Sequence, residues 1–368
     1  MPHPRTWVIL SDKLGDNGQV EAIASALPWP CERKQVLMLE RYVQGKPRFR
    51  PSLHHIDRER SDPLAAPWPD LILTMGRRPA MVALWVRQQS GDKTRVVLVG
   101  KPTSRMLDFD LIISSAEKHM PALANYLPIT LPLMRIKPEA VAEAVQQWQA
   151  RFDVLPKPIV AIMVGGATSP FVMNKQVAEE LLATARWVID DLGGTPYVST
   201  SRRTAPVVVE TLRDGLPVQA EFFEWTAGAK DNPYRALLGV ADGVIVSGDS
   251  ISMMVEAIYL RKPLAIFALP YGWLGHLDQL RRSFARWLFN PEKKTRRDAI
   301  RHWLARAVFY LDYFTLLSST RDFRYFHQML VARGLAVWSG QPFAEVGGEL
   351  PEDISAAVTR IEALFEQG

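Results

Sequence analysis

Cysteine is nearly absent from this sequence: among 368 residues there is one, Cys31. A single thiol excludes an internal disulfide framework and a cysteine-based zinc site, and it is typical of a reducing compartment. Long apolar runs are also missing. The longest, 263–275, contains two prolines and is shorter than the roughly 20 apolar residues of a spanning helix. The first residues hold too short an apolar run for a signal peptide, so we expect a cytoplasmic protein.

Common metal and nucleotide motifs are missing as well. The glycine pair at 165–166 fits neither GxGxxG nor GxxxxGK[ST], which argues against a dinucleotide fingerprint and a P-loop. The seven histidines are scattered without an HxxxH pair, and no GxSxG elbow supports a serine triad. Asp108-Phe109-Asp110 has the DxD pattern of metal-dependent glycosyltransferases, but its apolar neighbours indicate the lead-in to a strand. We therefore expect no metal and no cofactor, and no nucleic-acid module is recognisable.

The composition is that of an ordinary soluble globular protein, with 48% apolar and 23% charged residues. The length predicts two domains, and strands alternate with helices in both halves, which indicates parallel sheets covered on both faces. The segment 152–158 has two prolines and is typical of a linker. We predict domains over 1–155 and 156–275 and a C-terminal extension over 276–368. Strands are expected at 7–10, 35–39, 71–75, 95–99, 111–114, 129–133, 159–164, 196–199, 220–223, 244–246 and 264–268.

Residues 241–268 form the most informative stretch, a predicted strand, loop, helix and strand. Ser252 is a candidate cap for the helix, where free amides and the helix dipole favour an anion such as phosphate. Glu256 lies four residues later on the same face, where a carboxylate would accept hydrogen bonds from ribose hydroxyls. The alternative is an ordinary helix with a serine cap and a solvated glutamate.

Three further turns follow predicted strands. Gly165 and Gly166 would let a phosphate approach the backbone, or would simply make a tight turn. The guanidinium groups after Ser201, those of Arg202 and Arg203, suit diphosphate oxygens, or form a solvated basic turn. Asn232 precedes a proline and is a candidate helix cap or ligand contact.

The first loop is rich in polar groups: Asp12, Asp16, Asn17 and Gln19 surround two glycines. In a two-domain protein this loop would face the cleft from the N-terminal domain. A carboxylate there would deprotonate an acceptor hydroxyl, and Asp16 is the candidate general base. The alternative is a turn that only caps the following helix.

The C-terminal third is basic and aromatic. From 279 to 306 there are nine basic residues against two acidic ones. Leu280, Phe284, Trp287 and Leu288 are predicted to share one helical face. Such a helix either lies on an anionic membrane surface or packs across both domains with its charges in water.

Several of these segments together resemble the mitochondrial-fission (elongated-mitochondria) family of GT-B-type glycosyltransferases, here as a bacterial member. The resemblance covers about residues 7–270 and rests on GDNGQ, GRRPA, VGG, SRRT, DNPY, ADGVIVSGDSISMMVEA and RKP. It implies two Rossmann-like domains facing a cleft, an N-terminal acceptor domain and a C-terminal donor domain. Glu256 matches the family's ribose-binding glutamate by position. Asp16 stands where the family often has histidine.

The leading hypothesis is a metal-independent, inverting transfer of a sugar from a nucleotide-diphosphate sugar to a hydroxyl acceptor, such as a lipid-linked cell-envelope glycolipid. The alternatives are a nucleotide-sugar epimerase of the same architecture and a non-catalytic membrane-associated scaffold. The location would be cytoplasmic, with peripheral contact to the inner membrane as a further option. The expected nucleotide-sugar contacts are Gly165, Gly166, Ser201, Arg202, Arg203, Asn232, Ser247, Asp249, Ser250, Ser252, Met253 and Glu256.

Overall fold

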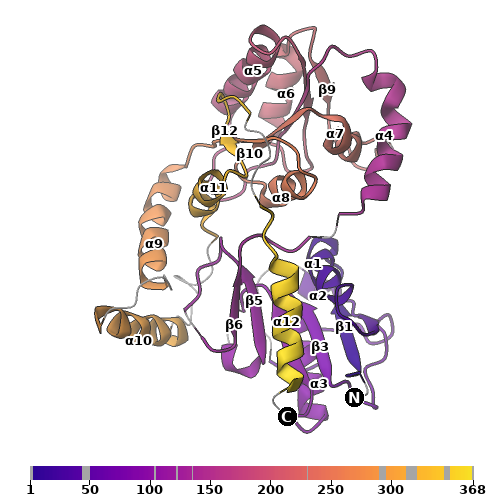
Figure 1. The fold of residues 1–368 in the computed structure, drawn as a ribbon, viewed down its shortest axis with the longest axis vertical. Helices are drawn as coiled ribbons and strands as arrows, with labels where there is room; N and C mark the ends of the chain where they lie inside the picture. Colours follow the sequence, from indigo (N-terminus) through magenta and orange to yellow (C-terminus); the bar gives the residue numbers. More distant parts are fainter. Residues whose placement is uncertain are drawn as a thin grey trace. The chain divides into compact units, whose positions relative to one another are not determined.

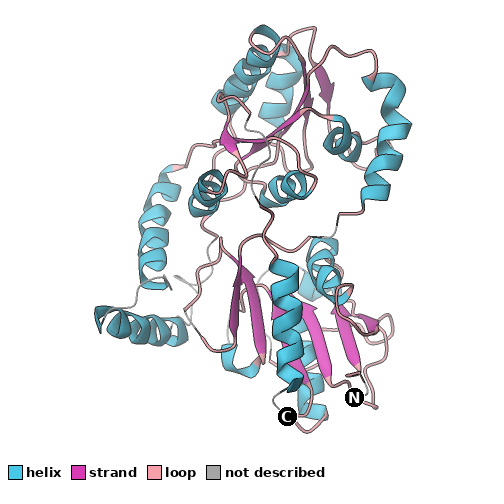
Figure 2. Ribbon diagram, in the orientation of Figure 1, coloured by secondary structure: helices cyan, strands magenta, loops and turns pink. Residues whose placement is uncertain are grey.

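The chain forms two compact units, each built around one six-stranded parallel sheet (Figures 1 and 2). The computed structural model describes residues 3–43, 50–102, 105–121, 123–134, 136–229, 231–289, 296–311, 321–343 and 349–366. Unit 1 consists of Met1–Arg135, Phe284–Arg321 and Pro351–Gly368, and unit 2 of Ile136–Ser283 and Asp322–Leu350. The expected fold class, two parallel-sheet α/β domains, is confirmed.

The sheet of unit 1 has the strand order β2-β1-β3-β4-β5-β6. Its strands are β1 (Thr6–Leu10), β2 (Cys31–Gln35), β3 (Leu71–Met75), β4 (Arg95–Val99), β5 (Leu111–Ser115) and β6 (Tyr126–Ile129). Its helices are α1 (Leu14–Ala24), α2 (Glu40–Val43), α3 (Arg77–Gln89), the 3-10 turn η1 (Met106–Asp108), α10 (Arg296–Leu311) and α12 (Asp353–Glu366). Helix α9 (Trp273–Phe289) begins in unit 2 and ends in unit 1.

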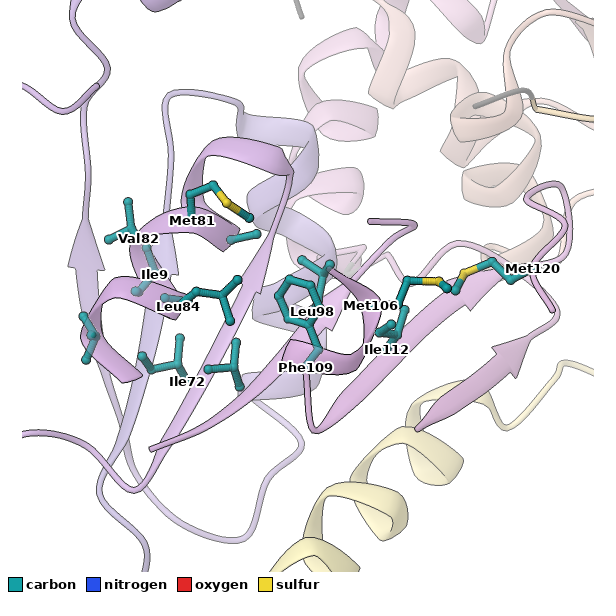
Figure 3. Close-up of a cluster of buried hydrophobic side chains, with 14 of the residues drawn as sticks. Ile9, Ile72, Met81, Val82, Leu84, Leu98, Met106, Phe109, Ile112 and Met120 are labelled. Carbon is teal, nitrogen blue, oxygen red and sulfur yellow. The ribbon is translucent and has the colours of Figure 1, made fainter. Parts of the chain in front are cut away.

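Side chains alternate between the two faces of this sheet, as the strand period requires. One face carries Ile9, Ile72 and Leu98, which pack with α3 (Figure 3). Apolar residues of α9 and α10 belong to the same cluster. The other face carries Val8 and Val97 and their neighbours, which pack against α1 and α12. Both faces are therefore buried, which explains the continuous apolar runs of the central strands.

The sheet of unit 2 has the order β12-β11-β10-β7-β8-β9. Its strands are β7 (Ile159–Met163), β8 (Thr195–Ser199), β9 (Glu221–Phe223), β10 (Gly243–Ser247), β11 (Leu264–Phe267) and β12 (Val337–Trp338). Its helices are α4 (Pro138–Phe152), α5 (Lys175–Asp190), α6 (Pro206–Gly215), α7 (Tyr234–Val240), α8 (Ile251–Tyr259) and α11 (Phe323–Ala332). In the described part of the chain, none of the helices has the length and apolarity that crossing a bilayer requires.

Two expected strands are displaced in the structure. The predicted strand at 35–39 is wrong, because β2 lies at Cys31–Gln35, a polar edge strand with Glu32 and Arg33 exposed. The predicted strand at 129–133 is also wrong: β6 ends at Ile129. The amides of Thr130 and Leu131 donate instead to the Asp353 carboxylate, at 2.9 and 2.8 Å. The apolar run at 129–133 is thus buried without joining the ladder.

The units divide the chain differently from the boundaries predicted at 155 and 275. Helix α4 lies beside α7 in unit 2 (Figure 1), and its Trp148 and Phe152 rings stack with centroids 5.9 Å apart. The C-terminal segment contributes α11 and β12 to unit 2 and α10 and α12 to unit 1. These elements complete both units.

Candidate functional site

The strand order of unit 2 places a topological switch point between β7 and β10. From β7 the chain continues to β8 and β9 on one side, and then returns to β10 on the other side. In open parallel sheets, ligands bind outside the carboxyl ends of the strands at such a point. The turns after β7, β10 and β8 therefore meet at one edge of the sheet.

The turns after β7 and β10 are joined by buried hydrogen bonds. The Gly165 amide donates to Ser247 Oγ at 2.7 Å, and the Gly166 amide donates to Asp249 Oδ2 at 2.8 Å. Ser247 Oγ donates in turn to Asp249 Oδ1 at 2.7 Å. Burial raises the pKa of the Asp249 carboxyl, although the Gly166 amide, the Ser247 hydroxyl and Arg203 each lower it in part. Asp249 thus holds the two turns together.

The turn after β8 is fixed to the same glycine. Ser201 Oγ and Thr204 Oγ1 both donate to the Gly165 carbonyl oxygen, at 2.8 and 2.6 Å. Arg203 Nη1 donates to Thr168 Oγ1 at 3.0 Å, and its Nη2 lies 3.8 Å from Asp249 Oδ2. Arg202 is exposed. Of the two predicted arginines, Arg203 therefore contacts the turn after β7.

The two glycines are needed for close packing inside these turns. A Cβ atom on Gly165 would lie 2.4 Å from Asp249 Oδ1, and one on Gly166 would lie 2.3 Å from the Arg203 backbone oxygen. The space beside both glycines is filled by the protein itself. Since their amides already have acceptors, the geometry favours a structural turn over direct phosphate contact at these residues.

Helix α8 begins two residues earlier than the sequence suggests. Its N-cap is Ser250, so the prediction that Ser252 caps the helix is wrong. Ser252 is exposed and lies in the first turn beside the half-buried Met253. The first amides of an α-helix have no partner within the helix and carry the positive end of its dipole. The N-terminus of α8 thus lies at the switch point next to the buried Asp249.

Glu256 has a partner that the sequence did not reveal. The phenol of Tyr234, the first residue of α7, donates to Glu256 Oε2 at 2.5 Å. Burial raises the pKa of Glu256, and the Tyr234 hydrogen bond lowers it in part. Burial and the Glu256 charge raise the pKa of Tyr234 well above its usual value, so the phenol stays protonated.

Asn232 supports this tyrosine. Its Oδ1 accepts a hydrogen bond from the Tyr234 amide at 3.0 Å. The N-cap of α7 is Pro233, so Asn232 stands just before the cap. In the sequence, Tyr234 stands directly after Asn232 and Pro233, at the start of a predicted helix. That position is a weak signal for its contact with Glu256.

The predicted base, Asp16, lies in the first turn of α1. The predicted loop is shorter than expected, because the helix begins at Leu14 and Asn17 closes the turn. Asn17 Oδ1 accepts from the Ser11 amide, and its Nδ2 donates to the Ser11 carbonyl, at 2.9 and 2.7 Å. The side chain of Asp16 lies outside the described part of the structure. Its backbone follows β1 at the carboxyl edge of the unit 1 sheet.

The DxD pattern has a structural explanation. Asp110 Oδ2 accepts from Arg87 Nη1 at 3.0 Å and from the Val96 amide at 2.7 Å. Phe109 between the two aspartates is buried, and Asp108 pairs with Arg105. Among the described residues, no group of three or more His, Cys, Asp or Glu side chains is arranged to hold a metal ion.

Two parallel-sheet α/β domains, with candidate ligand-binding turns at the carboxyl ends of the strands, are typical of the GT-B-like fold. The chain belongs to the family described as Mitochondrial fission ELM1, whose model matches residues 15–286. A Rickettsia prowazekii (strain Madrid E) protein, described as uncharacterized, is 25% identical over 77% of this chain and 90% of its own length. Mitochondrial fission protein ELM1 of Arabidopsis thaliana is 23% identical over 54% of this chain and 51% of its own.

A solved structure shares the architecture. It is a Listeria monocytogenes protein assigned as a UDP-N-acetylglucosamine 2-epimerase, with a TM-score of 0.50 and 11% sequence identity. The match covers 99% of this chain and 97% of the other. At this identity the likeness shows the fold.

Proposed function

We propose that this protein transfers a sugar from a nucleoside-diphosphate sugar to an acceptor hydroxyl, without a metal ion. The observation that carries the proposal is the α8 N-terminus at the switch point of unit 2, with Glu256 one turn further on. The first-turn amides and the dipole suit a diphosphate. Tyr234 holds Glu256 Oε2, and Oε1 of the same carboxylate would accept from ribose hydroxyls.

The chemistry follows from these roles. Asp16 takes the proton of the acceptor hydroxyl, the acceptor oxygen bonds to the anomeric carbon, and the bond from that carbon to the diphosphate oxygen breaks. The α8 amides, with Arg202 and Arg203 at the neighbouring strand end, stabilise the leaving diphosphate in place of a metal. Gly165, Gly166, Ser201, Ser247 and Asp249 hold the turns in shape, and Ser250, Ser252 and Met253 form the helix start.

The first test is nucleotide binding. We expect one nucleoside diphosphate from a panel of bases to raise the melting temperature of the full chain, because a ligand that binds only the folded state stabilises it. Glu256→Ala should weaken the binding of that nucleotide by roughly 1–3 kcal/mol, the usual cost of losing hydrogen bonds to a charged group. Glu210→Ala, an exposed glutamate on α6, is the matched control.

The second test separates the enzyme classes. A transferase releases nucleotide from its donor only when an acceptor is present, and a chelator leaves the rate unchanged. An epimerase changes the sugar without an acceptor. A nucleotide bound tightly but never turned over would indicate a scaffold. An unchanged affinity of Glu256→Ala for every nucleotide would refute the ribose contact.

The proposed acceptor is presented at an anionic membrane surface, which the protein contacts peripherally from the cytoplasm. The support is an exposed apolar stripe along α9, formed by Trp273, Leu277, Leu280, Phe284 and Trp287. Basic residues follow it in the sequence, among them Lys293, Lys294, Arg296 and Arg297, whose side chains lie outside the described part of the structure. Apolar contact flanked by cations is the pattern of interfacial helices.

A further inference from the structure

Unit 1 contains a pocket of about 190 Å³ at the carboxyl ends of β3 and β4. Its apolar wall includes Met81, Leu98 and Phe109, which are buried members of the core cluster shown in Figure 3. Gly76 and Gly100 also line the pocket, with φ of 93° and 90°. These conformations suit glycine, and they keep the strand ends open where a side chain would otherwise project.

The polar side of the pocket is entirely cationic among the described residues that line it. It consists of Arg77, Lys101, Lys118 and Arg321, with no aspartate or glutamate. Lys101 Nζ donates to the His119 carbonyl at 2.6 Å, which fixes the ammonium group beside the pocket. Lys118 Nζ lies 3.9 Å from Oε1 of the buried Glu117, within ion-pair distance, so this one carboxylate offsets part of the positive charge of the four cations.

The N-terminus of α3 adds to this positive field. Arg77 is the first residue of this 13-residue helix, and the N-cap, Gly76, has no side chain to cap it. A helix start beside clustered cations is a favourable place for phosphate oxygens, and the arginine fork matches their geometry. The adjoining wall of methionine, leucine and phenylalanine suits an apolar group attached to that phosphate.

From this juxtaposition we infer that the pocket binds a phosphorylated amphiphile, with the phosphate on the four cations and the apolar portion against the core wall. This is a second ligand site, separate in the chain from the nucleotide site of unit 2. Its identification as the acceptor site rests on the proposed function, because the pocket shares the sheet edge that carries Asp16. The binding itself does not depend on that function.

The test uses hexyl phosphate, inorganic phosphate and hexanol as probes with the full chain, by titration calorimetry. Hexyl phosphate should bind more tightly than either fragment. Lys118→Gln and Arg321→Gln, the latter at an exposed position, should each lower the affinity for hexyl phosphate by about tenfold, as expected when a charged hydrogen bond is lost. Lys93→Gln is the matched control, since Lys93 is exposed just before β4, at the opposite end of that strand from Lys101.

Three results would overturn the inference. Equal affinity for inorganic and hexyl phosphate would leave only an anion patch. Equal affinity for hexanol and hexyl phosphate would leave only an apolar pocket. If both variants bind hexyl phosphate with the affinity of the wild type, the ligand binds elsewhere. Nucleotide binding, measured in the same variants, should stay unchanged, so failure of this inference is distinguishable from failure of the nucleotide proposal.

Discussion

In the turn after β7, a single glycine is required for close packing. Gly165 lies against a buried carboxylate, and a methyl group there would overlap Asp249. We expect Gly165→Ala to lower the free energy of unfolding by about 1–3 kcal/mol, the usual cost of overpacking a closed interior. Urea denaturation of the wild type and the variant measures this difference.

Gly18 provides the opposite case as a control. It lies inside α1, and a Cβ atom added there meets nothing within 4 Å. Gly18→Ala should raise the free energy of unfolding by about 0.5–1 kcal/mol, because alanine loses less backbone freedom in a helix. If both alanines had the same effect, the packing explanation of Gly165 would be wrong.

Asp16 is the residue whose role is purely chemical in the proposal. Asp16→Asn keeps the size of the side chain and removes its basicity, so turnover should fall on the order of 10²-fold or more. The dissociation constant of the nucleotide should change little, because Asp16 lies in unit 1 and the nucleotide residues lie in unit 2. Steady-state kinetics combined with nucleotide titration checks both expectations. Retained activity would move the base to another residue, with Asp12 and His119 the next to test.

At the scale of elements, the strands buried on both faces were predictable, whereas the edge strands β2 and β12 were not. The runs at 71–75 and 95–99 match β3 and β4 because strands buried on both faces are continuously apolar. Strand β2 is polar because it lies at the edge of its sheet, and β12 has two residues. Neither leaves a periodic signal in the sequence.

For the candidate site, the positions at the strand ends were predictable and the side-chain contacts were not. Parallel strand ends bring Gly165, Ser201 and Asp249 together, and the sequence places all three within three residues of the end of an expected strand. The contact of Arg203 with Thr168 and the bond between Tyr234 and Glu256 depend on how the side chains are packed. Spacing along the chain does not determine such contacts.

Helix α9 has two apolar faces, and one of them is exposed. Leu288 and Ala285 are buried in the unit 1 core, contrary to the prediction that Leu288 shares the outer face. The outer stripe, spaced by alternating steps of four and three residues from Trp273 to Trp287, is 45% to 75% exposed. The basic side of the predicted helix is partly internal too, since Arg282 is buried and pairs with Asp278. The proposed membrane contact through α9 would therefore be largely apolar.

This geometry changes the design of the membrane experiment. Leu280→Glu combined with Trp287→Glu should reduce binding to anionic liposomes by about tenfold or more, since each large apolar side chain contributes roughly 1.5–3 kcal/mol when buried. Co-sedimentation measures the bound fraction. High salt should weaken wild-type binding only in part, because salt screens the cations and not the apolar contact.

The control for this experiment is Val218→Glu, which replaces an exposed apolar residue outside the stripe. It should bind like the wild type. A wild type that ignores anionic liposomes at low salt would remove the membrane from the proposal, and the stripe would then need another occupant.

At the scale of the whole molecule, each unit contains one buried histidine with a strongly lowered pKa. Burial lowers the pKa of His55 in unit 1 to about 4, with His54 and Arg78 acting in the same direction and the Arg78 carbonyl opposing it. Burial lowers the pKa of His327 in unit 2 to about 4 as well, opposed by the Gly248 backbone and by Asp322. His327 lies on α11, and its Cε1 is 3.0 Å from the position of a Cβ on Gly248, so it supports the turn after β10.

The sign of the pH effect follows from the protons bound in each state. Below pH 6.5 the unfolded chain protonates these histidines while the folded chain keeps them neutral. The free energy of unfolding is therefore undiminished above pH 6.5 and falls as the pH drops toward about 4. Each histidine accounts for up to about 3 kcal/mol. Asp249 and Glu256, whose pKa values are raised, act in the opposite sense at the acidic end, since they take up protons more readily in the folded chain.

Urea denaturation at pH 7.5, 6.0 and 5.0 tests this expectation in full. The wild type should lose stability steadily across the series, and His55→Gln and His327→Gln should each lose less, because glutamine takes up no proton in the unfolded chain. His3→Gln, an exposed histidine, should follow the wild type. If both buried variants keep the wild-type slope, the acid sensitivity arises from other groups. If His327→Gln alone flattens it, the turn after β10 is the acid-sensitive part of the molecule, and nucleotide binding should weaken over the same pH range.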